Sequence, residues 1–182
     1  MISDSVQKEL QIGEILDFTL VESHEHLHLV CLLKHRLLFF DCKHLLNNFG
    51  SNDPADSRAR YTDSIELNDS EAVKIYAPLK NDGQIIVSSA TRLTLIAFDT
   101  WVSSLTAQFA LEPPEQDQDC PVQDVNIHGT QAFVCYQSKN KGCTFVVYDL
   151  NSNAPEGPSV AFRALYADCD KVLQIHYVPP PS

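Results

Sequence analysis

Positive charge, glycine and long apolar runs are all scarce in this sequence. Its 182 residues carry 13 Lys and Arg against 24 Asp and Glu, which gives a formal net charge of -11 at neutral pH. A field of that sign repels a polyphosphate backbone, so direct nucleic-acid binding is not expected. No window stays apolar over the ~18 to 20 residues that a membrane helix needs, and Met1–Leu10 lacks the basic start and apolar run of a signal peptide. These absences predict a protein of the cytoplasm or nucleus without a membrane span.

The sequence also lacks the short motifs that mark common catalytic and cofactor sites. It has only six glycines, and it contains neither a G-x-G-x-x-G nor a Walker-type loop that could hold a phosphate. No G-x-S-x-G turn offers a serine nucleophile. A cysteine nucleophile is conceivable at Cys31 or Cys42, near His35 and His44, but proximity in sequence does not place a base within hydrogen-bond reach. We therefore expect no cofactor and no catalytic residues.

The cysteines are scattered and contain no C-x-x-C pair; they are Cys31, Cys42, Cys120, Cys135, Cys143 and Cys169. Structural zinc sites normally show close pairs of ligands, and disulfide frameworks belong to oxidising compartments. Small buried apolar side chains are thus the favoured interpretation, ahead of a disulfide framework or a metal site.

What the sequence does contain is a repeated pattern of an apolar run that ends in an aromatic residue and an aspartate. It occurs at Phe40-Asp41, Phe98-Asp99 and Tyr148-Asp149, with the aspartates 58 and 50 residues apart. A second apolar run lies upstream of each, joined to it by a short polar turn. Each pair of runs therefore predicts a β-hairpin.

A further strand candidate precedes each hairpin and another follows it, and several of these alternate polar with apolar residues. The first begins as Glu14–Leu20. The chain thus divides into a single β-domain over residues 1–182 with three four-strand units at approximately 13–69, 72–111 and 122–167. Residues 171–178 look like the first strand of a further unit, before the Pro-rich end at 179–182.

These aromatic-aspartate hairpins resemble the WD40-like β-propeller superfamily, whose four-stranded blades often end their third strand in this way. The Trp-Asp and Gly-His dipeptides of that family are absent, so the chain resembles an atypical member. The resemblance implies an all-β fold of about three antiparallel blades plus an extra strand, a partial propeller. The alternative fold is a two-sheet β-sandwich or an irregular barrel.

Closed propellers have about four to eight blades. Three units and a spare strand would leave strand edges unpaired, so we expect the ring to be completed by downstream sequence, a partner or self-association. This expectation favours a non-catalytic scaffold or adaptor that binds other protein subunits, as the N-terminal part of a propeller in a multisubunit complex.

The segment from Glu22 to His28 carries an alternative hypothesis. If it were extended, His24, His26 and His28 would share one face with Glu22, and such a set could hold a catalytic zinc. That reading would make the protein a metal-dependent hydrolase or lyase. A polar surface loop with solvated imidazoles is the favoured interpretation, because the cluster lies between two strand candidates.

Positive charge recurs at the three hairpin turns, and equivalent turns of a blade array project on one face. The candidate partner-binding residues there are Lys34, Arg36, Arg92, Lys139 and Lys141, with Trp101 as a further anchor after the second repeat. They could meet an acidic peptide or a phosphate group. A solvated rim, and a Trp101 buried under a neighbouring unit, are the alternatives.

Overall fold

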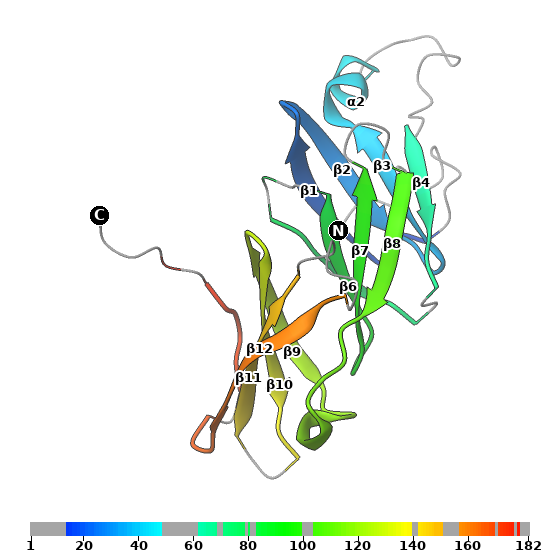
Figure 1. Ribbon diagram of the computed structural model, residues 1–182. Coiled ribbons are helices and arrows are strands. Elements are labelled where there is room, and N and C mark those ends of the chain that lie inside the picture. The colour runs from blue at the N-terminus through cyan, green and yellow to red at the C-terminus, as the bar shows by residue number, and fades with distance from the viewer. Residues whose placement is uncertain are drawn as a thin grey trace.

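Three four-stranded antiparallel sheets form the protein, and each uses four strands that are consecutive in sequence (Figure 1). The computed structural model describes residues 14–48, 62–68, 71–78, 80, 83–99, 104–139, 142–150, 157–169, 171–176 and 178. Within those residues three separate sheets pack one after another and none closes into a barrel, so the alternative of a two-sheet sandwich or an irregular barrel is wrong. The prediction of a partial propeller is confirmed, and we call the sheets blades 1, 2 and 3.

Within each blade the four strands follow one another in chain order. Two of the connections contain a short helix. Blade 1 comprises β1 (Asp17–Ser23), β2 (His26–Leu32), β3 (Arg36–Asp41) and β4 (Asp63–Glu66), with α2 (Cys42–Asn48) after β3. Blade 2 comprises β5 (Lys74–Tyr76), β6 (Gln84–Ser88), β7 (Leu93–Asp99) and β8 (Ser104–Ala110). Blade 3 comprises β9 (Val122–His128), β10 (Gln131–Gln137), β11 (Cys143–Asp149) and β12 (Ser159–Tyr166), preceded by the 3-10 turn η1 (Glu115–Asp117).

Blade 2 lies between the other two and packs on both, because its strands are apolar on both faces (Figure 1). We call its contact with blade 1 the first seam. The rings of Phe39 and Phe98 meet there with centroids 5.3 Å apart. The other buried members are Val21, Val30, Leu32, Leu37, Ile65, Leu67, Ala72, Ile75, Ile85, Val87 and Ile96. At the inner edge, Oδ2 of Asp17 accepts a hydrogen bond from the backbone N–H of Ile75, 3.0 Å away.

The contact between blades 2 and 3, the second seam, buries polar groups together with apolar ones. The hydroxyls of Tyr136 and Tyr148 lie 2.8 Å apart and form a hydrogen bond. Arg163 forms a bidentate ion pair with the buried carboxylate of Asp117. Its Nε donates to Oδ2 at 2.6 Å, and a terminal nitrogen donates to Oδ1 at 3.1 Å. The seam is therefore an apolar layer with a hydrogen-bonded pair inside it and an ion pair that joins η1 to β12.

The helix α2 was not predicted, and its beginning depends on the aspartate of the first repeat. Oδ1 of Asp41 accepts hydrogen bonds from the backbone N–H groups of Lys43 at 2.8 Å and His44 at 3.3 Å. A side chain that satisfies the free N–H groups of a first turn is an N-cap. Asp41 thus ends β3 and starts α2.

Residues 171–176 lie in no strand, although a strand was expected there. They run beside β9, where Oδ2 of Asp124 accepts a hydrogen bond from the Ile175 N–H at 2.6 Å. The side-chain amide of Asn126 donates to the Ile175 carbonyl at 3.1 Å. The segment is held through its backbone by two side chains of blade 3, and its role as the start of a further blade stays a prediction.

Candidate functional site

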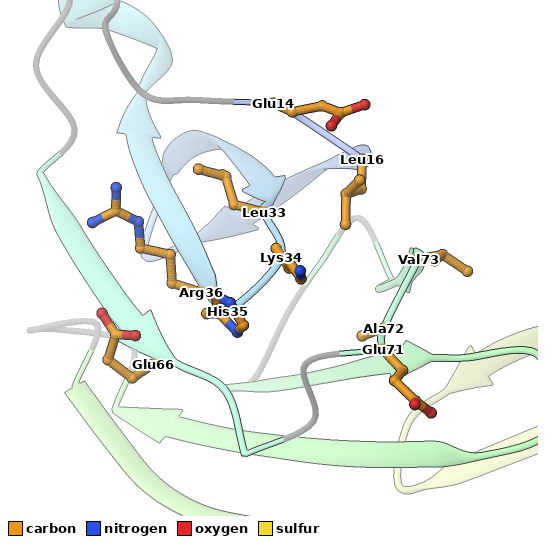
Figure 2. Close-up of a pocket in the computed structure, with 10 residues that line it drawn as sticks. All are labelled: Glu14, Leu16, Leu33, Lys34, His35, Arg36, Glu66, Glu71, Ala72 and Val73. Carbon is orange, nitrogen blue, oxygen red and sulfur yellow. The ribbon is translucent and has the colours of Figure 1, made fainter.

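A groove of about 650 Å³ lies where the turn between β2 and β3 meets the chain entering blade 2 (Figure 2). Its apolar surface is formed by Leu16, Leu33, Ala72 and Val73. The charged and polar residues of its wall are Glu14, Lys34, His35, Arg36, Glu66 and Glu71. The groove therefore combines apolar surface with charges of both signs.

The turn that forms one wall is fixed by backbone hydrogen bonds. The Leu33 N–H donates to the Arg36 carbonyl at 2.9 Å, and the Leu67 N–H donates to the His35 carbonyl at 2.7 Å. These bonds close the hairpin and attach it to the end of β4. Lys34 and His35 are exposed at the tip, whereas Leu33 is buried beneath them.

Arg92 reaches the rim of the same groove from blade 2. Its own turn is closed by the Ser89 N–H, which donates to the Arg92 carbonyl at 3.0 Å. Its guanidinium forms an ion pair with Glu71, and both side chains remain largely exposed. Three of the predicted basic residues thus gather around one feature, since Lys34 and Arg36 line the groove and Arg92 borders it through Glu71.

The remaining candidate contact residues are not part of this groove. Lys139 is exposed on blade 3, after β10, and is not among the residues that line the groove. Trp101 and Lys141 lie outside the described residues. Glu14 and Glu66 were not predicted as part of this groove, because they come from segments that only the packing of two blades brings together.

The histidine segment is not extended at His24 and Glu25, so the common face of His24, His26 and His28 on which the zinc hypothesis depended does not form. The chain reverses at His24 and Glu25, whose φ angles are 49° and 66°, and Ser23 pairs with His26 across the hairpin. Two residues with positive φ are what a type I′ hairpin turn requires. His26 and His28 do share a face of β2, with ring centroids 6.4 Å apart. Among the residues that the structure describes, no group of three or more His, Cys, Asp or Glu side chains could hold a metal ion.

His28 has an environment that the sequence did not reveal. It pairs with Asp41 across β2 and β3, and its Nδ1 is buried with no hydrogen-bond partner in the described part of the chain. Burial lowers the pKa of His28 below its ordinary value, while the nearby Asp41 carboxylate opposes that shift. The side chain is thus favoured in its neutral form.

Several of the thiols are held in their unreactive form by burial. All six cysteines are free, and burial raises the pKa of Cys31 and of Cys135 to about 12. Burial also raises the pKa of Cys42. Because the thiolate is the nucleophile, a thiol with a raised pKa is a poor one at neutral pH.

Comparison with known proteins supports the architecture alone. No protein-family model matches the chain, and no curated protein sequence matches it. In the described part of the chain, no helix is long and apolar enough to cross a membrane.

Among solved structures, the WD40 domain of Pan2 from Neurospora crassa is similar with a TM-score of 0.50 and 11% identity, over 91% of this chain and 42% of that one. A GH43 glycoside hydrolase with an engineered active site matches with a TM-score of 0.43 and 11% identity, over 79% of this chain and 28% of that one. A luciferin-regenerating enzyme matches with a TM-score of 0.39 and 13% identity, over 82% and 46% of the two chains. This chain spans less than half the length of each. At such identities the likeness to the WD40 domain shows the fold, and it confirms the resemblance that the aromatic-aspartate hairpins predicted.

Proposed function

We propose that this chain is a non-catalytic interaction module, a scaffold or adaptor that holds a segment of a partner protein in the groove between blades 1 and 2. The observation that carries the proposal is the groove itself, in which an apolar surface is bordered by charges of both signs. They are Lys34 and Arg36, Glu14 and Glu66, and the Arg92–Glu71 pair. Apolar contact surrounded by a polar rim is the usual composition of a protein-binding surface.

The chemistry of the groove defines the segment that fits it. Leu16 and Val73 leave 36% and 50% of their surface exposed, enough to cover one or two apolar side chains of a peptide. Lys34 stands exposed beside them on a fixed turn, so acidic residues next to the apolar ones would find positive charge there. A short segment with an apolar anchor and flanking Asp or Glu is therefore the partner chemistry that we propose.

A wider role follows from the partial ring. We propose that the module acts within a multisubunit complex in the cytoplasm or nucleus, a location that six free thiols favour. Its partners are other protein subunits. The resemblance to a WD40 domain supports this by architecture, because folds of this kind host many functions.

The test is a selection of short random peptides displayed on phage against the immobilised full-length chain. We expect enrichment of peptides with an apolar residue next to acidic ones. Synthetic versions are then measured by fluorescence anisotropy against the double variant Lys34→Glu/Arg36→Glu. Loss of two charge-assisted contacts should weaken binding by about tenfold or more.

Lys43→Glu is the matched control, because Lys43 is an exposed lysine at the opposite end of β3, outside the groove. It should bind the selected peptides as the unaltered chain does. Equal loss in both variants would mean that overall charge, and not the groove, governs binding. Peptides that bind all variants alike would contradict the proposal.

A further inference from the structure

Three of the six thiols gather on blade 3, and we call them the thiol cluster. Cys135 lies on β10, Cys143 lies on β11, and Cys169 lies in the turn that follows β12. The thiol of Cys143 is in side-chain hydrogen-bond contact with the thiol of Cys135 and with that of Cys169. Its Sγ also lies 3.2 Å from the Cys169 carbonyl oxygen. Cys143 is therefore the central member of the cluster.

The sheet itself places two of these thiols together. Gln137 on β10 pairs with Cys143 on β11. Cys135 precedes Gln137 by two residues, so it points to the same face of the sheet and is the diagonal neighbour of Cys143. Val134 and Tyr136, on either side of Cys135, point into the second seam. The thiol cluster thus lies on the side of blade 3 turned away from blade 2.

The third thiol arrives through the turn at the end of β12. Tyr166, the last residue of that strand, pairs with Cys143, and its carbonyl accepts a hydrogen bond from the Cys169 N–H at 3.3 Å. The turn packs closely on the hairpin end beside it, because Gly142 has a φ of 89° and a Cβ there would collide with the Tyr166 carbonyl. Backbone contacts therefore hold the turn, and with it Cys169, next to Cys143.

The three thiols differ in how easily a dissolved reagent reaches them. Cys135 and Cys143 are 0% exposed and are fixed in strands, whereas Cys169 is only half-buried and lies in a turn. An oxidant in solution therefore meets Cys169 first. A disulfide requires sulfurs about 2.0 Å apart, and movement of a turn can bring Cys169 that close to Cys143. A bond between two strand residues would instead have to distort the sheet.

We propose that Cys143 and Cys169 are a redox-sensitive pair that a hydroperoxide converts into a disulfide. The Cys169 thiolate attacks one peroxide oxygen, the O–O bond breaks, and the other oxygen leaves with a proton as water or an alcohol. The sulfur of Cys143 then attacks the Cys169 sulfenic acid, whose hydroxyl leaves as water with the Cys143 proton. The two thiols lose two electrons in total, and the hydroperoxide gains them. In a reducing compartment such a disulfide is transient and acts as a sensor.

The disulfide would act on the segment that follows the turn. Residues 171–176 are held beside β9 because Asp124 accepts the Ile175 N–H and Asn126 donates to the Ile175 carbonyl. A bond from Cys169 to β11 ties the start of this segment to the sheet. Oxidation therefore keeps the segment on blade 3, and reduction allows it to leave. This inference goes beyond the peptide groove and uses none of its residues.

Peptide mapping of the full-length chain tests the proposal. The reduced chain is treated with hydrogen peroxide, remaining thiols are alkylated, and the protein is cleaved with trypsin after Lys and Arg. Cys143 then falls in the peptide 142–163 and Cys169 in 164–171. We expect these two peptides to appear linked, with a mass lower by two hydrogen atoms than their sum, and to separate in dithiothreitol. A bond from Cys135 to Cys143 would link 142–163 to residues 93–139 instead.

Variants assign the two roles. Cys169→Ser should abolish the linked peptides. Cys143→Ala should abolish them too, and it should let Cys169 continue to the sulfinic acid, because no second thiol captures its sulfenic acid. Cys42→Ser is the matched control, since Cys42 is also half-buried but lies in α2 on blade 1, and it should leave the link intact. Far-ultraviolet circular dichroism checks that the sheets persist in each variant.

Hydrogen exchange measures the effect on the segment. In the oxidised chain and in oxidised Cys42→Ser, the amide of Ile175 should exchange more slowly than in the reduced chain. Peroxide should not slow it in Cys169→Ser. Unchanged exchange at Ile175 in the disulfide form would overturn the control of the segment.

Two results would overturn the redox pair itself. The first is conversion of Cys169 to the sulfinic acid in the unaltered chain without any linked peptides, which would mean that Cys143 does not capture it. The second is a link that joins Cys143 to Cys135, which would place the oxidation inside the sheet.

Discussion

The two seams solve the same packing problem with different chemistry. The first joins blades 1 and 2 through aliphatic side chains and the Phe39–Phe98 pair. The second joins blades 2 and 3 around the hydrogen-bonded Tyr136 and Tyr148, and adds the Asp117–Arg163 pair at β12. Burial raises the pKa of Tyr148 to about 12, so both partners of the tyrosine pair stay protonated at neutral pH.

The difference concerns specificity as well as strength. Apolar packing tolerates small shifts, because dispersion contacts have no required direction. A hydrogen bond between buried hydroxyls and a bidentate ion pair tolerate much smaller shifts, because both depend on distance and angle. The tyrosine pair lies within blade 3, between β10 and β11, and the Asp117–Arg163 pair attaches the connection from blade 2 to β12. This polar geometry therefore fixes blade 3 internally and to the connection that leads into it, whereas the polar contact across the first seam is the Asp17–Ile75 hydrogen bond.

The largest expected effect is in the first seam, between blades 1 and 2. Phe39→Ala removes a ring that is 1% exposed and packed on Phe98, so we expect a loss of about 3 to 5 kcal/mol in the free energy of unfolding. Urea denaturation monitored by circular dichroism measures it. Phe162→Ala, at an exposed ring on β12, is the control and should cost far less. Equal losses of unfolding free energy in the two variants would show that Phe39 stabilises the first seam no more than an exposed ring does.

A smaller effect is expected at the ion pair between Asp117 and Arg163, beside the second seam. Arg163→Met leaves the Asp117 carboxylate, 1% exposed, without its cation, and should cost about 3 kcal/mol. The double variant Arg163→Met/Asp117→Leu should recover part of that loss, because no uncompensated charge remains. A double-mutant cycle by urea denaturation gives the coupling. Additive losses would contradict a direct interaction between the two side chains.

The smallest effect should be a dependence on pH at His28, on the side of blade 1 that faces blade 2. Burial holds the pKa of His28 below its ordinary value in the folded chain, with Asp41, His26 and Asp63 as its charged neighbours. The unfolded chain therefore takes up the proton more readily, so this contribution is complete above about pH 6.5 and is lost as pH falls.

His28→Gln should accordingly flatten the decline of unfolding free energy between about pH 7 and pH 5. His176→Gln, at an exposed histidine in the segment beside β9, is the control and should keep the slope of the unaltered chain. Thermal unfolding at several pH values measures both. A steeper slope in His28→Gln would reverse the assigned direction.

Much of the strand pattern could be predicted because strand periodicity and apolar runs are local properties. The runs before Asp41, Asp99 and Asp149 are buried strands, as expected. The first strand was misplaced by three residues, from Glu14–Leu20 to Asp17–Ser23. The turn that sets its end uses His24 and Glu25 at positive φ, without the Gly or Asn that usually announces such a turn.

The candidate groove could be predicted only in its basic half. Lys34, Arg36 and Arg92 were found because turns of a blade array share a face, which is a topological property. The apolar residues and Glu66 line the groove only because blade 1 packs against blade 2, and neither Val73 nor Glu66 carries a local signal of that contact. The helix α2 was missed for a related reason, since a single Asp before seven residues is a weak cap signal.

The buried thiols provide a way to measure local opening of the sheets. Cys31 lies on the side of blade 1 turned away from blade 2, and Cys135 lies on the side of blade 3 turned away from blade 2. Burial raises the pKa of each to about 12. An alkylating reagent at neutral pH therefore reacts with either one only when its blade opens. Mass spectrometry of the modified peptides would measure how fast each thiol is alkylated. Opening of blade 1 and of blade 3 could thus be followed separately in a single sample, without any added label.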